Sequence, residues 1–276
     1  MTTNENENQL SHPTERMLGL DLFSGVGGIS VALSPYVTPV AYCENDRYAQ
    51  GVLLSRMWSG DLPEAPIWDD VLTLSGAMLP QIDIIYGGFP CQDISIAGRG
   101  AGLGGKRSGL FFEIVRLIGE IRPCFVFLEN VPAIRIRGGD IVAKELARLG
   151  YDSRWATLSA ADVGANHHRK RWWLLAHANS GDGRVQSECG GSSKTFSSNN
   201  GSEKYVADAH GINETSITKE CQGVRRSNTT GWWRVEPHVG RVAHGVPQRV
   251  DRLRGLGNSV VPVQAREAFE RLMGLK

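Results

Sequence analysis

The chain has 276 residues, of which 41% are hydrophobic and 21% charged, and its formal net charge is +1. This length allows one large domain or a large and a small one. No apolar run reaches the roughly 18 residues that indicate a membrane span. A charge near zero excludes recognition of nucleic acid by overall charge, so such a partner would require basic residues gathered on one face. The five cysteines lack paired metal-ligand spacing and are odd in number, which predicts no metal site and is typical of free thiols in a reducing cytoplasm.

The start of the chain predicts a disordered lead followed by a nucleoside-binding βα unit. Residues 1–15 are polar and lack a signal peptide's apolar core. Residues 17–23 predict a buried strand, and a glycine-rich turn and a helix over 29–33 follow. A second strand over 37–43 ends at Glu44, which approximates the Rossmann arrangement with an acidic residue on the ribose. The GxGG pattern favours a nucleoside without phosphates over NAD.

The run Asp-Leu-Phe-Ser-Gly-Val-Gly-Gly at residues 21–28 resembles the first signature of the DNA (cytosine-5) methyltransferases, whose cofactor is S-adenosylmethionine. The resemblance implies that Phe23, Gly25 and Gly27 line the cofactor pocket. It also implies that Glu44 binds the ribose.

Two acidic residues follow a possible third strand at Trp68. Asp70 matches the family position that accepts a hydrogen bond from the adenine amino group. Asp69 could do this instead, or either residue could cap a helix. Asn45 stands where many relatives carry a bulky side chain that packs on adenine.

Residues 83–95 form an apolar run bounded by glycines, which predicts a short buried strand and a turn that carries Cys91. On this stretch alone Cys91 is either a small buried hydrophobe or a reactive thiol at the carboxyl end of a strand, where α/β folds place ligands. Gly-Phe-Pro-Cys-Gln at residues 88–92 resembles the family's catalytic loop. The resemblance implies that Cys91 attacks the cytosine ring and that Pro90 borders the cofactor.

A glycine-rich basic segment follows at residues 97–107. It is either a mobile surface loop or a lid that closes over an extruded base, with Arg99 and Arg107 on DNA phosphates. A helix then runs to about residue 121, before Pro123. In it, Leu110 matches a cofactor contact of the family and is otherwise ordinary core.

Residues 123–130 predict another buried strand, which ends in a carboxylate. A glutamate in this place is often a solvated edge residue or a salt-bridge partner. Glu129-Asn130-Val131 matches the next signature, which implies that Glu129 stabilises the N3 side of the cytosine. A buried carboxyl group has a raised pKa, as an acid in this role requires.

A helix over 139–149 and a strand over 154–160 precede a basic cluster and a strand over 172–176. A basic cluster can simply be a solvated face. Arg169 and Arg171 alternate, which predicts that both point to one face. They resemble the family's QxRxR signature, with His167 in the position of Gln. The resemblance implies that Arg171 reaches the cytosine O2 and the cysteine, and that Arg169 supports the sulfur and nearby phosphates; a neighbouring guanidinium lowers the pKa of a thiol.

From residue 177 to residue 248 we expect a separate domain; within it, residues 178–231 are dense in Asn, Ser, Gly and Thr, a composition that suggests loops or disorder. In the family this interval holds the target-recognition domain, so we expect a small, loop-rich domain facing the major groove. The candidates for DNA contacts are Arg225, Arg226 and Arg234, with two tryptophans beside them, and each is equally open to a structural role.

The end of the chain returns to the first domain. Gly-Asn-Ser-Val-Val-Pro at residues 257–262 looks like the family's last signature, which implies that Asn258 and Val260 complete the cofactor pocket. A Gly-Asn turn would otherwise be a helix start. We expect the final helix, over 263–273, to pack beside the first strand.

The sequence therefore predicts a Rossmann-like doubly wound α/β methyltransferase sheet from residues 16–176 plus 249–276, with 177–248 as a loop-rich insert. The resemblance implies a site-specific DNA (cytosine-5) methyltransferase that uses S-adenosylmethionine and flips a cytosine out of double-stranded DNA. We expect a monomer in the cytoplasm of a bacterial or phage-infected cell, with no membrane and no obligate protein partner, in a restriction–modification setting. The alternatives are an RNA cytosine-5 methyltransferase and a non-catalytic S-adenosylmethionine-binding DNA-recognition protein.

Overall fold

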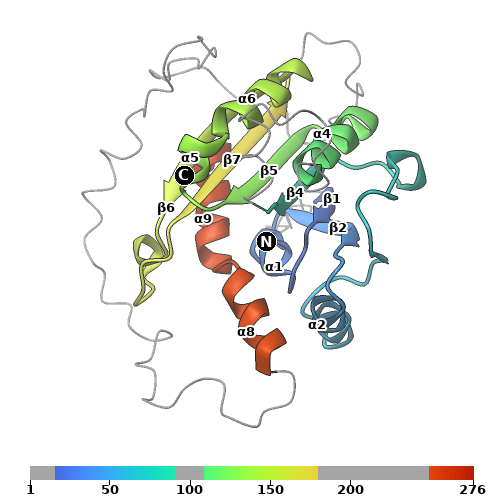
Figure 1. The fold of residues 1–276 in the computed structure, drawn as a ribbon, viewed down its shortest axis with the longest axis vertical. Coiled ribbons are helices and arrows are strands. Elements are labelled where there is room, and N and C mark those ends of the chain that lie inside the picture. Colours follow the sequence, from blue (N-terminus) through green and yellow to red (C-terminus); the bar gives the residue numbers. More distant parts are fainter. Residues whose placement is uncertain (1–15, 91–108, 180–248) are drawn as a thin grey trace, which may run out of the picture.

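A computed structural model describes residues 16–90, 109–179 and 249–276, which form one seven-stranded sheet with helices on both faces (Figure 1). Cys91, the predicted lid and nearly all of the predicted insert lie outside the described residues. The strands are β1 (Met17–Leu22), β2 (Val37–Cys43), β3 (Ile67–Trp68), β4 (Ile84–Gly88), β5 (Phe125–Asn130), β6 (Tyr151–Leu158) and β7 (Arg171–Ala178).

The sheet has the order β3-β2-β1-β4-β5-β7-β6. The first five of these strands run parallel, and β7 is antiparallel to both of its neighbours, β5 and β6. β1 lies between β2 and β4, so successive connections leave it in opposite directions. This is the topological switch point, and ligands of open α/β sheets bind at the carboxyl ends of the strands there. The glycine turn after β1 and the residues after β4 flank it.

The helices alternate with the strands along the chain. The α-helices are α1 (Gly28–Leu33), α2 (Arg47–Trp58), α4 (Leu110–Ile121), α5 (Ile134–Arg137), α6 (Gly139–Arg148), α8 (Arg249–Asn258) and α9 (Pro262–Met273). Two short 3₁₀ turns, Gly76–Met78 and Ala160–Val163, complete the described elements.

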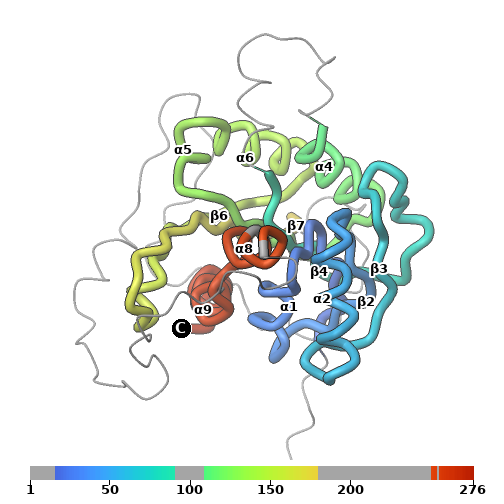
Figure 2. Tube along the Cα trace, turned by 60° about the horizontal axis from the view of Figure 1, so that its bottom comes forward, coloured from blue at the N-terminus to red at the C-terminus, as the bar shows by residue number. Residues whose placement is uncertain are grey.

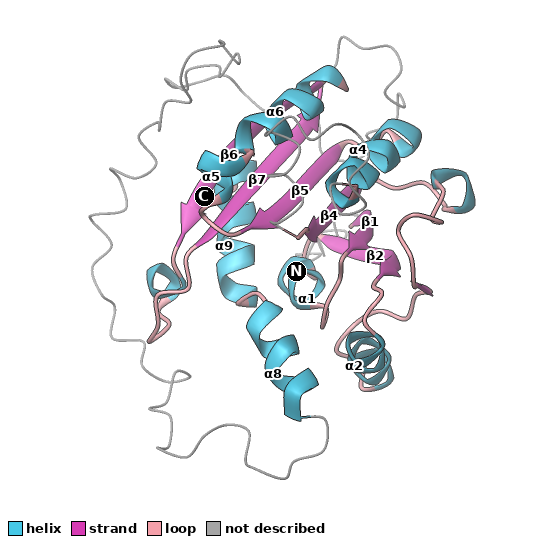
Figure 3. Ribbon diagram, in the orientation of Figure 1, coloured by secondary structure: helices cyan, strands magenta, loops and turns pink. Residues whose placement is uncertain are grey.

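Two apolar clusters, one on each face of the sheet, form the core. The first joins α4 and α6 to the sheet, with Ile114 and Leu146 fully buried. The second joins α1 and α9 to the opposite face (Figure 3). In it, Phe127 of β5 stacks on Trp173 of β7 and meets Phe269 of α9 edge-on, with ring centroids 5.4 and 5.3 Å apart. The two helical layers confirm the predicted doubly wound fold.

The two ends of the chain build one domain. α9 packs mainly on α1, β6 and β7 (Figure 2), and Met17 of β1 borders the same apolar cluster as Phe269 of α9. Its Glu270 accepts a hydrogen bond from the Tyr36 hydroxyl at 2.7 Å, and its Arg266 donates to the carbonyl of Ala32 at 2.8 Å. These bonds fix the last helix to α1 and to the turn that follows it.

Some expectations were wrong in detail. The strand predicted over 154–160 runs from Tyr151 to Leu158. Helices α2, α5 and α8 were not predicted, and Asn258 ends α8 instead of starting a turn. The glycines of α8 lower its helix propensity, and α8 contacts α2. Of the described cysteines, Cys43 is a buried free thiol, whereas Cys124 is disulfide-bonded, which contradicts the expected free thiol there.

No helix in these described ranges is long and apolar enough to cross a bilayer. The same ranges contain no group of three or more His, Cys, Asp or Glu side chains that could hold a metal ion.

Candidate active site

A buried ion pair lies at the carboxyl end of β5. Glu129 and Arg171 meet through Oε1 and Nε at 2.6 Å, and their side chains are only 12% and 15% exposed. The antiparallel pairing of β5 with β7 brings them together, because Glu129 is paired with Trp173 and Arg171 is two residues from it. Burial raises the pKa of Glu129 to about 7, against the opposing charges of Arg171 and Arg169. This confirms the raised pKa that the sequence predicts.

The strand that leads to Cys91 is shaped around this carboxyl group. Gly88 of β4 pairs with Glu129 of β5, and a Cβ on Gly88 would lie 2.6 Å from Glu129 Oε2. A residue with a Cβ at this position would force the carboxylate to shift. The next residue, Phe89, accepts a hydrogen bond at its carbonyl from Asn130 Nδ2 at 2.9 Å. Pro90 follows, exposed, and is the last described residue before Cys91.

Arg169 makes contacts that the sequence did not predict. It precedes β7, and its guanidinium donates hydrogen bonds to the carbonyls of Gly257 and Ser259. Its charge still acts on Glu129. Arg169 therefore binds the end of α8 and the linker that follows it, and its predicted support of the sulfur and of phosphates remains a prediction.

The turn after β1 has the strained backbone of a ligand loop. Gly25 and Gly27 have φ angles of +54° and +78°. Phe23 has φ +53°, a left-handed conformation that side chains with a Cβ rarely adopt. Because strain of this kind persists only where the surroundings impose it, it marks the turn as a candidate binding site.

Glu44 closes this turn from the neighbouring strand. Its Oε2 accepts from the Gly25 N–H at 2.7 Å and its Oε1 from the Asp46 N–H at 2.8 Å. A carboxylate oxygen accepts two hydrogen bonds, so both oxygens retain capacity for a diol such as that of ribose.

Val260, in the segment 257–262, contacts the same turn. A Cβ on Gly28 would lie 2.9 Å from Val260 Cγ2, so the valine packs directly on the glycine turn. Asn258 ends α8 with an exposed side chain. The linker after α8 therefore forms one side of the proposed pocket.

Three partly buried apolar side chains, Phe23, Trp68 and Leu110, pack against the same core cluster. Asp70 lies two residues beyond Trp68, and its Oδ1 accepts from the Leu72 N–H at 2.9 Å. It thus holds a turn, and the helix-capping alternative is wrong for it. Apolar walls with carboxylates at their edges fit the nucleoside of S-adenosylmethionine.

The sequence did not predict a buried polar network that lies beneath the turn. Asp21 of β1 is 1% exposed, and its Oδ2 accepts from the Ser30 hydroxyl, which also contacts the Tyr86 hydroxyl at 2.8 Å. Its Oδ1 has no hydrogen-bond partner in the described part of the chain. Burial raises the pKa of Asp21 to about 7; the Ser30 bond opposes this and the charge of Glu44 adds to it. An aspartate inside an apolar strand was the available signal.

Comparison with known proteins places these features in a family context. The profile of the family described as C-5 cytosine-specific DNA methylase matches residues 17–236. The chain is 39% identical over 159 residues to the type II methyltransferase M.CviJI of Paramecium bursaria Chlorella virus IL3A, covering 57% of this chain and 42% of that one. It is 34% identical over 165 residues to M.HhaI of Haemophilus parahaemolyticus, covering 58% and 49%. The chain thus spans less than half the length of these relatives.

A crystal structure of a Spodoptera frugiperda DNMT2 mutant matches the fold with a TM-score of 0.51 and 19% identity. The match covers 62% of this chain and 54% of that one. At this identity the likeness supports the fold alone, a Rossmann-like sheet with helices on both faces.

Proposed function

The chain belongs to the C-5 cytosine-specific DNA methylase family, and we propose that it transfers a methyl group to C5 of cytosine in DNA, with S-adenosylmethionine as donor. The observation that carries the proposal is the buried Glu129–Arg171 pair beside the backbone that leads to Cys91. The pair lies on β5 and β7, and β4 separates β5 from β1, which precedes the glycine turn. One edge of the sheet therefore holds both the methyl-donor pocket and the groups that act on the pyrimidine.

The proposed reaction begins when the Cys91 thiolate forms a bond to C6 of the cytosine. Electron density moves into the ring, and Glu129, which can carry a proton near pH 7, stabilises the N3 side. Arg171 orients Glu129 and reaches O2. Bound S-adenosylmethionine supplies an electrophilic methyl group on a sulfonium. C5 would take that methyl group as the sulfur–methyl bond broke, a base would remove the C5 proton, and elimination would break the bond to Cys91.

We propose double-stranded DNA with a flipped cytosine as the substrate of a monomeric enzyme. Residues 177–248 would read the sequence. The proposed DNA contacts, which lie outside the described residues, are Arg99, Arg107, Arg225, Arg226 and Arg234. The membership of the chain in a DNA methylase family supports this assignment over an RNA substrate.

The test expresses the chain in a host free of DNA methylation and sequences its DNA after bisulfite treatment. We expect protected cytosines within one short sequence context. Cys91→Ser should abolish protection, and Glu129→Gln should lower the methylation rate by about 10²–10⁴-fold. Both variants should bind S-adenosylhomocysteine as the wild type does.

Glu145→Gln is the control, because this glutamate pairs with Arg148 on the surface of α6 and should leave methylation unchanged. Absence of protected cytosines together with absence of S-adenosylhomocysteine binding would contradict the proposal. Loss of cofactor binding in Cys91→Ser would assign Cys91 a structural role.

A further inference from the structure

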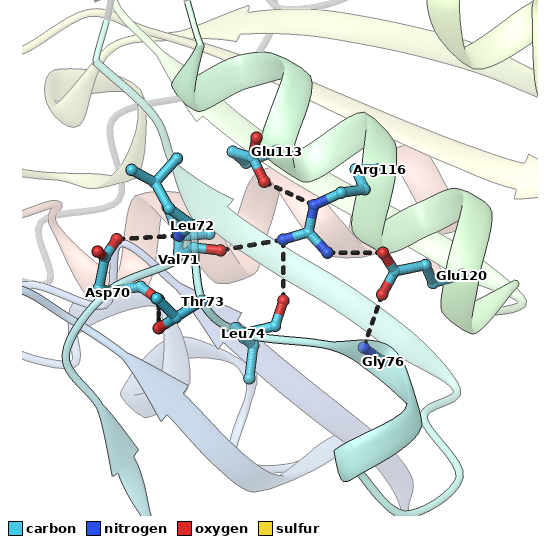
Figure 4. Close-up of polar contacts among 9 residues, drawn as sticks. All are labelled: Asp70, Val71, Leu72, Thr73, Leu74, Gly76, Glu113, Arg116 and Glu120. Carbon is cyan, nitrogen blue, oxygen red and sulfur yellow. Dashed lines mark hydrogen bonds and ion pairs between the residues drawn. The ribbon is translucent and has the colours of Figure 1, made fainter.

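Arg116 of α4 gathers four acceptors around one guanidinium (Figure 4). Its Nε contacts Glu113 Oε2 at 2.6 Å, and its Nη1 contacts Glu120 Oε1 at 2.6 Å. Its Nη2 donates to the carbonyls of Val71 and Leu74, at 3.0 and 2.8 Å. The two glutamates orient the guanidinium, and the two carbonyls belong to a segment more than 40 residues away in the chain.

That segment carries Asp70. The Asp70 carbonyl accepts from the Thr73 N–H and hydroxyl, at 3.0 and 2.9 Å, and its Oδ1 accepts from the Leu72 N–H. Its second oxygen, Oδ2, makes no hydrogen bond within the described ranges. The turn therefore presents one carboxylate oxygen for an outside donor, and Arg116 holds the two carbonyls that follow it.

A second contact from α4 secures the far end of the segment. Glu120 Oε2 accepts from the Gly76 N–H at 2.8 Å (Figure 4). Residues 70–75 contain no helix or strand, so these hydrogen bonds, with the buried Val71 and Leu74, fix their position. Because α4 begins at Leu110, one helix anchors both the apolar wall and the acidic turn of the proposed adenine pocket.

The contribution of Arg116 lies in geometry rather than in charge. Its side chain is 32% exposed, and partly exposed ion pairs within a helix add little to stability. A planar guanidinium holds several acceptors in fixed directions, which an ammonium group cannot do. Displacement of a positioned group by about 1 Å is enough to weaken a directional contact.

We propose that Arg116 is a positioning residue for cofactor selectivity: it fixes the turn of Asp70 so that this carboxylate recognises the 6-amino group of adenine. This rests on the proposed function. An adenine amino group donates to the carboxylate, whereas hypoxanthine presents a carbonyl oxygen there, which the carboxylate repels. The site should therefore prefer S-adenosylhomocysteine over S-inosylhomocysteine by about 10-fold or more, since hydrogen bonds to charged groups discriminate strongly.

The test measures the dissociation constants of both compounds by titration calorimetry on the full chain. Arg116→Gln should raise the dissociation constant of S-adenosylhomocysteine by about 10-fold and change that of S-inosylhomocysteine by less than about twofold. Asp70→Asn should reduce the preference for S-adenosylhomocysteine, because the asparagine amide can donate a hydrogen bond to the carbonyl of hypoxanthine. The double variant should lose no more preference than Asp70→Asn alone. Arg148→Gln, which removes a surface guanidinium with a 65% exposed side chain, is the matched control.

If Arg116→Gln weakens the binding of both compounds equally, Arg116 has a merely structural role and the inference is overturned. The inference is also overturned if Arg116→Gln keeps the wild-type preference for S-adenosylhomocysteine. If Arg116→Gln does not fold, as judged by thermal unfolding, the same measurements on Arg116→Lys decide, with the same two outcomes against the inference. A wild-type chain that binds neither compound would instead refute the proposed function.

Discussion

At the residue scale the site depends on carboxyl groups that the fold removes from water. Glu129 and Asp21 both have a pKa raised to about 7 by burial. Glu129 has a guanidinium partner, Arg171, whereas the Asp21 carboxylate accepts a hydrogen bond from the Ser30 hydroxyl. A carboxyl group that keeps its proton near neutral pH can donate to a ring nitrogen, so burial prepares Glu129 for its proposed role. Asp21 instead makes folding sensitive to pH.

The sign of this sensitivity follows from proton linkage. In the unfolded chain Asp21 releases its proton near pH 4, and in the folded chain near pH 7. Between these values the folded state holds a proton that the unfolded state lacks. The free energy of unfolding that Asp21 contributes is therefore fully present below about pH 4 and is lost as the pH rises to about 7.

Asp21→Asn should flatten this dependence, since an amide does not titrate. We expect the wild type to lose up to a few kcal/mol of unfolding free energy between pH 5 and pH 8, at most about 1.4 kcal/mol per pH unit from this group, and the variant to lose clearly less. Urea unfolding at both pH values measures the difference. In Asp21→Asn the free energy of unfolding should still fall somewhat as the pH rises, because the pKa of Glu129 is raised as well. Identical slopes in the two proteins would contradict the prediction.

At the scale of elements, strand pairing brings together the groups that are proposed to be catalytic. The parallel pair β4–β5 sets Gly88 beside Glu129, and the antiparallel pair β5–β7 sets Arg171 beside the same carboxylate. Local patterns in the sequence predicted each of these strands. They did not predict α8, because Gly255 and Gly257 oppose a helix, and its contacts with α2 and with Arg169 are tertiary.

Gly88→Ala tests this arrangement of strands. The new methyl group would lie 2.6 Å from Glu129 Oε2, too close for contact, so the carboxylate must move away from Arg171. We expect the methylation rate to fall by about 10²-fold, as for other small displacements of reacting groups, with S-adenosylhomocysteine affinity unchanged. Gly51→Ala in α2 is the control, because its added Cβ meets no atom within 4 Å. Wild-type activity in Gly88→Ala would show that the carboxylate has room to move.

At the scale of the whole molecule, the last helix closes the domain that the first strand opens. Phe269 of α9 is fully buried and packs against both Tyr36, which lies between α1 and β2, and Phe127 of β5. The linker before α9 carries Val260 onto the glycine turn and accepts the hydrogen bonds of Arg169. The packing of α9 therefore supports the proposed cofactor pocket as well as the core.

Phe269→Ala should lower the free energy of unfolding by about 3–5 kcal/mol, the usual cost of removing a buried aromatic ring. Leu275→Ala, a change at a 54% exposed side chain just beyond the helix, should alter it by less than about 0.5 kcal/mol. Urea unfolding of the three proteins gives both values. A loss below about 1 kcal/mol for Phe269→Ala would mean that α9 contributes little to the domain.

The sequence by itself determined the first βα unit, the glycine turn, and the placement of Glu44, Asp70 and Glu129 at strand ends. These features depend on neighbours in the chain: apolar runs form strands, glycines permit positive φ angles, and parallel strands bring their carboxyl ends to one edge. Only the tertiary structure decided which groups Arg116 and Arg169 hold. Their acceptors include backbone carbonyls 42 and 90 residues away, and since every residue has a carbonyl, no side-chain pattern identifies which one a guanidinium will find.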